Sequence, residues 1–151
     1  MKVRIEMETR QRVDGTEEVF RHTASGILRE TGRELRIAYV LDGVRQSLRV
    51  DPERRRVVVL RGRGAETAEA LPGDVPAHAI CYEAGRHHVT IYETPVGEME
   101  LGFRTSAVSV QQETAGDLSI QLSYEMTQYG VTAADCELRI QIKPLAISCS
   151  R

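Results

Sequence analysis

The sequence predicts an all-β protein folded as a single closed antiparallel barrel. Apolar residues recur at every second position in long segments, as in Leu118, Ile120 and Leu122, and this period places successive side chains on opposite faces of a strand. Short turn-forming pairs such as Asp14-Gly15 and Asp42-Gly43 separate the segments, and connections this short join antiparallel neighbours. No long segment keeps the apolar period of about 3.6 residues that is typical of a helix.

The elements follow in order along the chain. The first segment alternates Val3, Ile5 and Met7 with charged residues, and the later ones repeat this pattern between turn residues. The basic run Arg54–Arg56 follows Asp51-Pro52-Glu53 and is interpreted as a solvated hairpin turn. We expect about nine to eleven strands, at residues 2–13, 17–30, 33–41, 44–50, 56–61, 78–83, 87–94, 97–105, 106–113, 117–128 and 134–143.

One segment has the composition of a helix. Residues Ala65–Leu71 are rich in helix formers, but the segment is too short to be stable alone, and Pro72-Gly73 ends it.

Strand length favours a closed sheet. Strands of ten or more residues leave long unpaired edges in an open sheet, and closure into a barrel removes these edges. A sandwich of two sheets would also explain the alternation, although sandwiches usually have shorter strands and longer connections.

Length and composition indicate the number of domains, the classes of partner and the cellular location that we expect. A chain of 151 residues is one domain in size, with an expected core at residues 2–143 and a tail at 144–151. The 20 basic residues are interspersed among 22 acidic ones, so we expect no nucleic-acid binding. No segment approaches the ~20 apolar residues of a membrane span, and the first residues lack a signal peptide. Three cysteines without Cys-x-x-Cys spacing indicate free thiols, so the cytoplasm is the expected location.

These segments also carry a resemblance to a known bacterial family. The chain resembles the family named domain of unknown function 1934 (DUF1934) through most of its length. The elements that carry the resemblance are Gly26, Tyr39, Arg61-x-Arg63-Gly64, Ile80-x-Tyr82-x-x-Gly85 and Tyr92-Glu93-Thr94-Pro95-Val96-Gly97. The resemblance implies a barrel like those of the lipocalins and other calycins, with no established activity, cofactor or catalytic residue.

Catalytic and metal-binding motifs are missing from the sequence. It has no Gly-x-Ser-x-Gly, His-Glu-x-x-His or phosphate-binding glycine loop. His78, His87 and His88 lie close to Cys81 and Glu83, but adjacent histidines on a strand point to opposite faces, as do His78 and Cys81. We therefore expect no metal site and no cofactor, and enzyme activity is the least favoured class of function.

The candidate functional residues are three tyrosines and one arginine. Tyr39, Tyr82 and Tyr124 share the alternation phase of the apolar side chains, so their rings should point into the barrel. They would either fill the core or line a pocket for a small apolar or amphipathic molecule, with Arg61 at the mouth and residues 65–77 as a lid. The alternative function is a structural or interaction barrel with a filled core, pairing with itself as a homodimer or with a partner protein.

Overall fold

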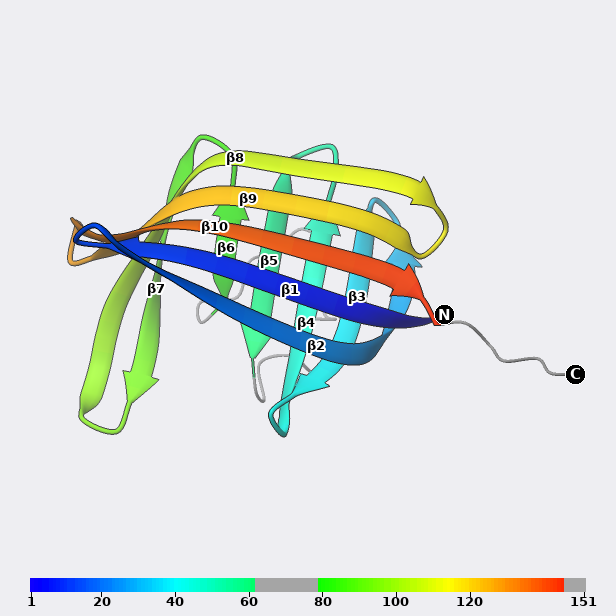
Figure 1. Cartoon of the computed structure of the whole chain (residues 1–151), viewed down its shortest axis with the longest axis horizontal. Helices are drawn as coiled ribbons and strands as arrows, with labels where there is room; N and C mark the ends of the chain where they lie inside the picture. The colour runs from blue at the N-terminus through cyan, green and yellow to red at the C-terminus, as the bar shows by residue number, and fades with distance from the viewer. Residues whose placement is uncertain (62–78, 146–151) are drawn as a thin grey trace, which may run out of the picture.

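The structure, a computed structural model, describes residues 1–61 and 79–145, and these residues form ten strands (Figure 1). All ten belong to one antiparallel sheet with the order β6-β5-β4-β3-β2-β1-β10-β9-β8-β7. Neighbours in the sheet are consecutive in sequence except β1 and β10, which pair from Val3↔Pro144 to Arg12↔Asp135. The strands are β1 (Lys2–Val13), β2 (Thr16–Thr31), β3 (Glu34–Leu41), β4 (Val44–Asp51), β5 (Arg56–Arg61), β6 (Ile80–Glu83), β7 (Arg86–Thr94), β8 (Gly97–Thr114), β9 (Asp117–Gln128) and β10 (Val131–Pro144).

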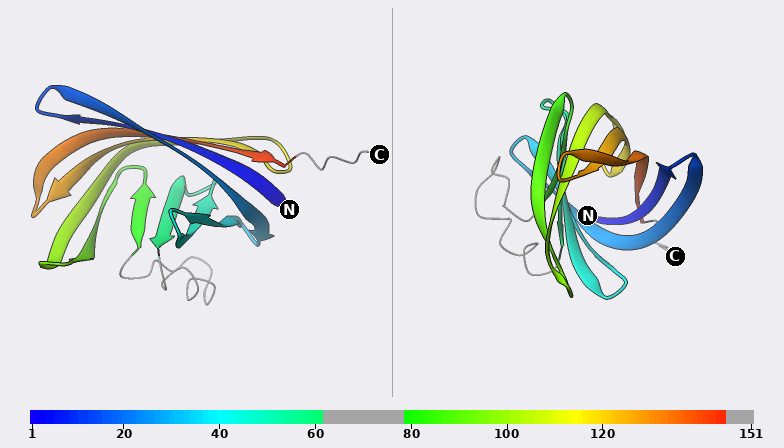
Figure 2. Two further views of the ribbon diagram at one scale, coloured as in Figure 1. Left: turned by 60° about the horizontal axis from the view of Figure 1, so that its bottom comes forward. Right: turned by 90° about the vertical axis from the view of Figure 1, so that its left-hand side faces the viewer.

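The sheet coils into a nearly closed barrel. The long strands β8, β9, β10, β1 and β2 run across the molecule, and β3–β6 cross behind them (Figures 1 and 2). The two ends of the sheet, β6 and β7, lie against each other at a seam. The turn that joins them is held to β8, where the Gly85 amide donates to the Thr105 carbonyl at 2.9 Å. No ladder joins β6 to β7 in the described residues. The predicted antiparallel barrel is therefore confirmed, and the two-sheet sandwich is excluded.

The main core lies inside this barrel and follows the predicted alternation. Val3 and Ile5 of β1, Ile120 of β9 and Ile142 of β10 have no exposed surface. Each buried side chain of this size stabilises the fold by about 1.5–3 kcal/mol. Residues 3–7, 118–122 and 138–142 were predicted to be strands with one buried face. Alternate residues of these strands pack in the core, which confirms the prediction.

Two-residue turns with positive φ connect several strands. Asp14-Gly15 and Asp42-Gly43 have positive φ at both positions, as type I′ turns require, because this turn matches the twist of the strands. Tyr129-Gly130 makes a third such turn, with φ of 50° and 82°. The last strand was predicted to begin at residue 134, without this turn, whereas β10 begins at Val131.

One predicted strand boundary is wrong. Residues 97–105 and 106–113 were predicted as two strands, but they form the single strand β8. A β-bulge between Thr105 and Ala107 takes up the irregularity: Ser106 leaves the ladder and its hydroxyl donates to the Ser123 carbonyl at 3.1 Å. The predicted helical segment at 65–71 lies outside the described residues. Among the residues that are described, no helix has the length and apolar character needed to cross a membrane.

The basic run is only partly a solvated turn. The amide of Arg54 donates to Asp51 Oδ1 at 3.1 Å, which fixes the predicted turn after β4. Arg56, however, is the first residue of β5 and only 4% exposed, so the prediction of a solvated side chain is wrong for Arg56.

Candidate functional site

Two of the predicted site residues meet in an aromatic cluster inside the barrel. The rings of Tyr82 and Tyr124 lie 4.7 Å apart, and Phe103 packs against them at 5.5 and 6.0 Å. Both tyrosines are buried, and burial raises the pKa of Tyr124 above its usual value, with the phenol of Tyr82 adding to the shift. These two side chains therefore pack with the core.

Tyr39 and Arg61, the other predicted site residues, lie near Gln46. The Tyr39 hydroxyl donates to Gln46 Oε1 at 2.9 Å in a buried hydrogen bond. Burial raises the pKa of Tyr39, and the nearby positive charge of Arg61 partly opposes this shift. Arg61 is exposed and lies opposite Gln46 in the β4–β5 ladder. Tyr82 also raises the pKa of Tyr39, so the three predicted tyrosines lie in one core cluster, with Arg61 exposed beside Tyr39. The predicted lid, residues 65–77, lies outside the described residues.

A groove of about 640 Å³ lies on the outer face of β2, β3 and β4. Its size falls within the range of about 300–1,000 Å³ that is typical of small-molecule sites. Tyr39 is one of its lining residues, whereas Arg61, Tyr82 and Tyr124 are not. The described lining residues are Ser25, Gly26, Ile27, Arg29, Thr31, Arg36, Ala38, Tyr39, Val40, Arg45, Gln46, Ser47 and Arg49.

The groove begins where β2 and β3 separate. β2 pairs with β1 over residues 16–27 and with β3 only from Gly26 to Thr31, so Gly26↔Tyr39 is the last pair of the β2–β3 ladder. A Cβ atom at Gly26 would lie 2.5 Å from the Ala38 carbonyl oxygen. Glycine therefore allows the close approach of two backbones at this fork, as is common at barrel corners.

A row of three arginines crosses the groove. The sheet register pairs Arg29 of β2 with Arg36 of β3, and Arg36 with Arg49 of β4. Residues paired in this way project from the same face, and like charges directly opposite each other destabilise a sheet. With Arg45, four of the described lining residues are cationic and none is acidic. The described lining of the groove is therefore cationic.

A buried carboxylate, Glu34, lies beside this row on the same face of β3 as Arg36. Glu34 accepts two hydrogen bonds from Arg49, at 3.0 and 3.1 Å, in the bidentate geometry that favours arginine. Arg36 Nε lies 3.5 Å and Arg56 Nη2 lies 3.8 Å from the same carboxylate. Glu34 is 5% exposed and Arg49 is 2% exposed. A single carboxylate thus faces three guanidinium groups in a poorly solvated position.

Arg36 retains donors that the protein does not use. Its Nε and Nη2 are buried, and neither has a hydrogen-bond acceptor; the 3.5 Å contact of Nε with Glu34 is an ion pair without hydrogen-bond geometry. A buried donor without an acceptor costs about 1–3 kcal/mol, and more when the group is charged. An anion in the groove could accept from these donors once the Arg36 side chain turns toward it.

The rest of the groove wall is apolar. Ile27 is 45% exposed and Val40 is 55% exposed, and Ala38 lies between them on the central strand. Cationic donors and exposed aliphatic side chains in one groove suit a molecule with an anionic head and an apolar body.

Metal-binding residue types gather at a second place, the seam between β6 and β7. Cys81, Glu83 and His88 have their potential ligand atoms within 4.8 Å of one another. His87 contacts Thr127 on the other side of β7, which confirms that the adjacent histidines point to opposite faces. His78 lies outside the described residues. The prediction of no metal site rested on the pairs His87/His88 and His78/Cys81, and neither pair is the combination of Cys81, Glu83 and His88.

The arginine groove is not apparent from the sequence. Arg29, Arg36 and Arg49 come from three strands and each occupies a polar position in its own alternation, so each by itself indicates only a solvated face. The register that places them side by side becomes apparent only when the strands are paired. The signal available in the sequence was that arginines, and no acidic residues, occupy the polar positions that the three strands pair with one another at Arg29, Arg36 and Arg49.

Comparisons with known proteins support the fold. The family model described as domain of unknown function (DUF1934) matches residues 5–140. The crystal structure of the ywiB protein from Bacillus subtilis is similar with a TM-score of 0.76 and 16% sequence identity, covering 96% of this chain and 92% of that chain. No curated protein matches the chain.

Proposed function

The chain belongs to the DUF1934 family, a domain of unknown function, and we propose that it is a binding protein for a small amphipathic anion held in the groove of β2–β4. The observation that carries the proposal is the unused pair of donors on Arg36, which are buried in a groove that four arginines line. The ligand that fits has a carboxylate or phosphate head and an apolar body.

The head group would lie against the arginine row. Arg29 and Arg36 are direct cross-strand neighbours, so a phosphate or carboxylate above them can accept from both guanidinium groups. Glu34 holds Arg49 by two hydrogen bonds, which fixes one side of the row before a ligand arrives. Such preorganisation lowers the cost of ordering side chains on binding.

The apolar body would lie along Ile27, Ala38 and Val40 toward the fork. Covering such partly exposed aliphatic side chains contributes about 25 cal/mol per Å² of apolar surface removed from water. Tyr39 and Gln46 border this end of the groove, so the proposal keeps Tyr39 as a site residue and places the ligand against the outer face of the barrel. We also propose a cytoplasmic location, which suits the free thiols of Cys81 and Cys136.

The test is calorimetric titration of the protein with decyl phosphate, decyl glucoside and inorganic phosphate. We expect decyl phosphate to bind with one site per chain, the neutral glucoside to bind at least about tenfold more weakly, and inorganic phosphate to bind weakly because it lacks the apolar body. Arg36→Gln should weaken decyl phosphate binding about 10- to 100-fold, since hydrogen bonds to charged groups contribute about 1.5–3 kcal/mol.

Two further variants locate the site. Ala38→Phe keeps all charges and fills the groove, so it should abolish decyl phosphate binding. Arg104→Gln removes an exposed arginine that pairs with Glu125 on another part of the sheet, and it should bind like the wild type. The proposal is wrong if decyl phosphate does not bind, if the glucoside binds equally well, or if Arg36→Gln and Ala38→Phe bind as the wild type does. Urea unfolding of each variant checks that it is folded.

A further inference from the structure

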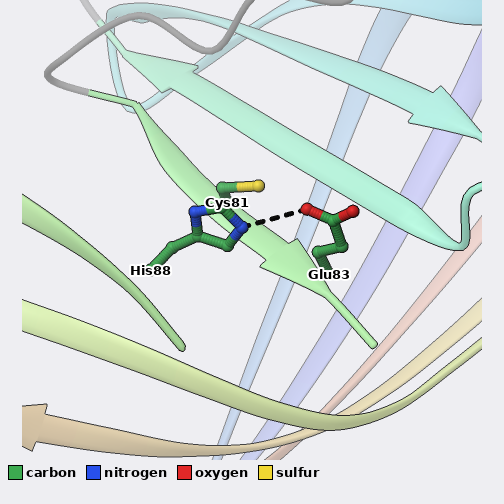
Figure 3. A group of neighbouring side chains, drawn as sticks. All are labelled: Cys81, Glu83 and His88. Atoms are coloured by element: carbon green, nitrogen blue, oxygen red, sulfur yellow. Dashed lines mark hydrogen bonds and ion pairs between the residues drawn. The ribbon is translucent and has the colours of Figure 1, made fainter. Parts of the chain in front are cut away.

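Three side chains with metal-ligand chemistry converge at the seam of the barrel. Cys81 and Glu83 project from one face of β6, and His88 reaches them from β7 (Figure 3). His88 Nε2 lies 3.0 Å from Glu83 Oε1. The thiol sulfur, a carboxylate oxygen and an imidazole nitrogen all lie within 4.8 Å of one another.

The local fold explains why they meet. Residues two apart on a strand share a face, so Cys81 and Glu83 lie side by side. The chain then turns at Ala84-Gly85, where Gly85 adopts a φ of 78°, and enters β7 at the opposite end of the sheet order. His88 is the third residue of β7 and its side chain spans the seam.

We propose that Cys81, Glu83 and His88 bind one divalent transition-metal ion of the zinc type. Thiolate, imidazole and carboxylate are the ligands that Zn²⁺ takes in proteins, with bonds of about 2.0–2.3 Å. Tetrahedral geometry with these bonds separates ligand atoms by about 3.3–3.6 Å. The three ligand atoms lie within 4.8 Å of one another, so the side chains must adjust to reach these values when the ion binds. Three protein ligands leave a fourth position for water.

The charges around Cys81 and Glu83 influence how a metal ion would compete with the proton of the Cys81 thiol. Arg54 Nη2 and Arg86 Nε lie 4.0 and 3.9 Å from Glu83 Oε2, and the charges of Arg56, Arg54 and Arg49 act on Cys81. Burial raises the pKa of the Cys81 thiol to about 11, and these arginines and Glu83 modify the shift only partly. Metal binding must therefore release the thiol proton, so affinity rises with pH until the thiol is deprotonated without metal.

The ion would connect the two ends of the sheet. β6 and β7 have no ladder between them in the described part of the chain, and His88–Glu83 is a side-chain contact across their seam. A metal bond to residues of both strands would hold the seam shut, and the folded state would gain stability from the bound metal.

The test uses metal-free protein titrated with Co²⁺, which reports sulfur ligation by a charge-transfer absorption in the near ultraviolet. We expect one Co²⁺ per chain with this band, and displacement of Co²⁺ by Zn²⁺. Zn²⁺ at a hundredfold excess over its dissociation constant should raise the Tm by about 5–10 °C.

Three variants decide the assignment. Cys81→Ser should lose the charge-transfer band, and His88→Gln should weaken Co²⁺ binding at least tenfold; both are expected to fold, as judged by circular dichroism. His22→Gln, which changes an exposed histidine on β2, should bind Co²⁺ like the wild type. The proposal is overturned if the wild type shows no sulfur-to-cobalt band, if Cys81→Ser keeps it, or if His88→Gln binds Co²⁺ unchanged.

Discussion

Replacing Glu34 by glutamine should destabilise the protein more than the loss of any exposed ion pair. Glutamine keeps the size of the side chain and removes the charge that faces Arg36, Arg49 and Arg56. Because Arg49 is 2% exposed, its guanidinium cannot regain water when the carboxylate is gone.

The magnitude follows from burial and geometry. Breaking a buried charge pair by removing one partner costs about 3–5 kcal/mol. Glu34 makes two short hydrogen bonds with Arg49 at 3.0 and 3.1 Å, so the free energy of unfolding of Glu34→Gln should fall by about this full amount. For a domain of this size the same loss lowers the Tm by about 6–20 °C.

The assay is urea unfolding followed by circular dichroism, with Glu125→Gln as the matched control. Glu125 accepts from Arg104 at a similar distance of 3.0 Å, but its side chain is 42% exposed. The control should lose less than about 1 kcal/mol, because exposed ion pairs contribute little. Equal losses in the two variants, or a loss under about 1 kcal/mol for Glu34→Gln, would refute the importance assigned to burial.

Two further predictions concern the seam and the adjoining strands. A Cβ atom at Gly102 would overlap Thr127 Oγ1 and His87 Nε2, which hydrogen-bond across β8 at 3.0 Å, so Gly102→Ala should lower the free energy of unfolding by about 1–3 kcal/mol; an unchanged urea midpoint would contradict this packing. The folded-state pKa of the Cys81 thiol is raised from 9.0 to about 11, so the stability gained from the neutral thiol is complete below pH 9 and is lost as the pH rises toward 11. The urea midpoint of the wild type should therefore decline as the pH rises across this range, and that of Cys81→Ala should decline less steeply. Equal declines in the two proteins would show that Cys81 does not contribute to the pH dependence of stability.

The fold could be predicted because its determinants are local. Alternation along a strand and a glycine in a tight turn are both visible within a few residues, as in residues 118–122 and at Asp42-Gly43. The turn at Tyr129-Gly130 was missed because tyrosine rarely adopts positive φ, and its φ of 50° is a property of the pair in this hairpin. The bulge at Ser106 was likewise interpreted as a break between strands. It is recognised only from the pairing of Thr105 and Ala107 with residues of β9, which the local sequence does not show.

The candidate sites could not be predicted because they depend on register and on the seam. Arg36 belongs to a candidate binding site only because the pairing of β2, β3 and β4 places Arg29 and Arg49 beside it. Glu34 is likewise buried among guanidinium groups that come from β3, β4 and β5. Cys81 and His88 meet because the turn at Ala84-Gly85 and the curl of the sheet together bring β7 beside β6. The spacing of residues along one strand predicts neither the register of β2, β3 and β4 nor the approach of β6 and β7.

The pairing of β1 with β10 has a consequence for how the chain folds. Residues 14–130 lie between these two strands, so the ladder that joins them closes a very long loop, while every other ladder joins strands that follow each other in sequence. Folding should therefore proceed as two growing ribbons, one from each terminal hairpin, whose docking along Val3–Arg12 is the slow step. A circular permutant with linked termini and new ends at Ala84-Gly85 would make all nine ladders sequential, and it should fold faster than the natural order without losing a single backbone pair.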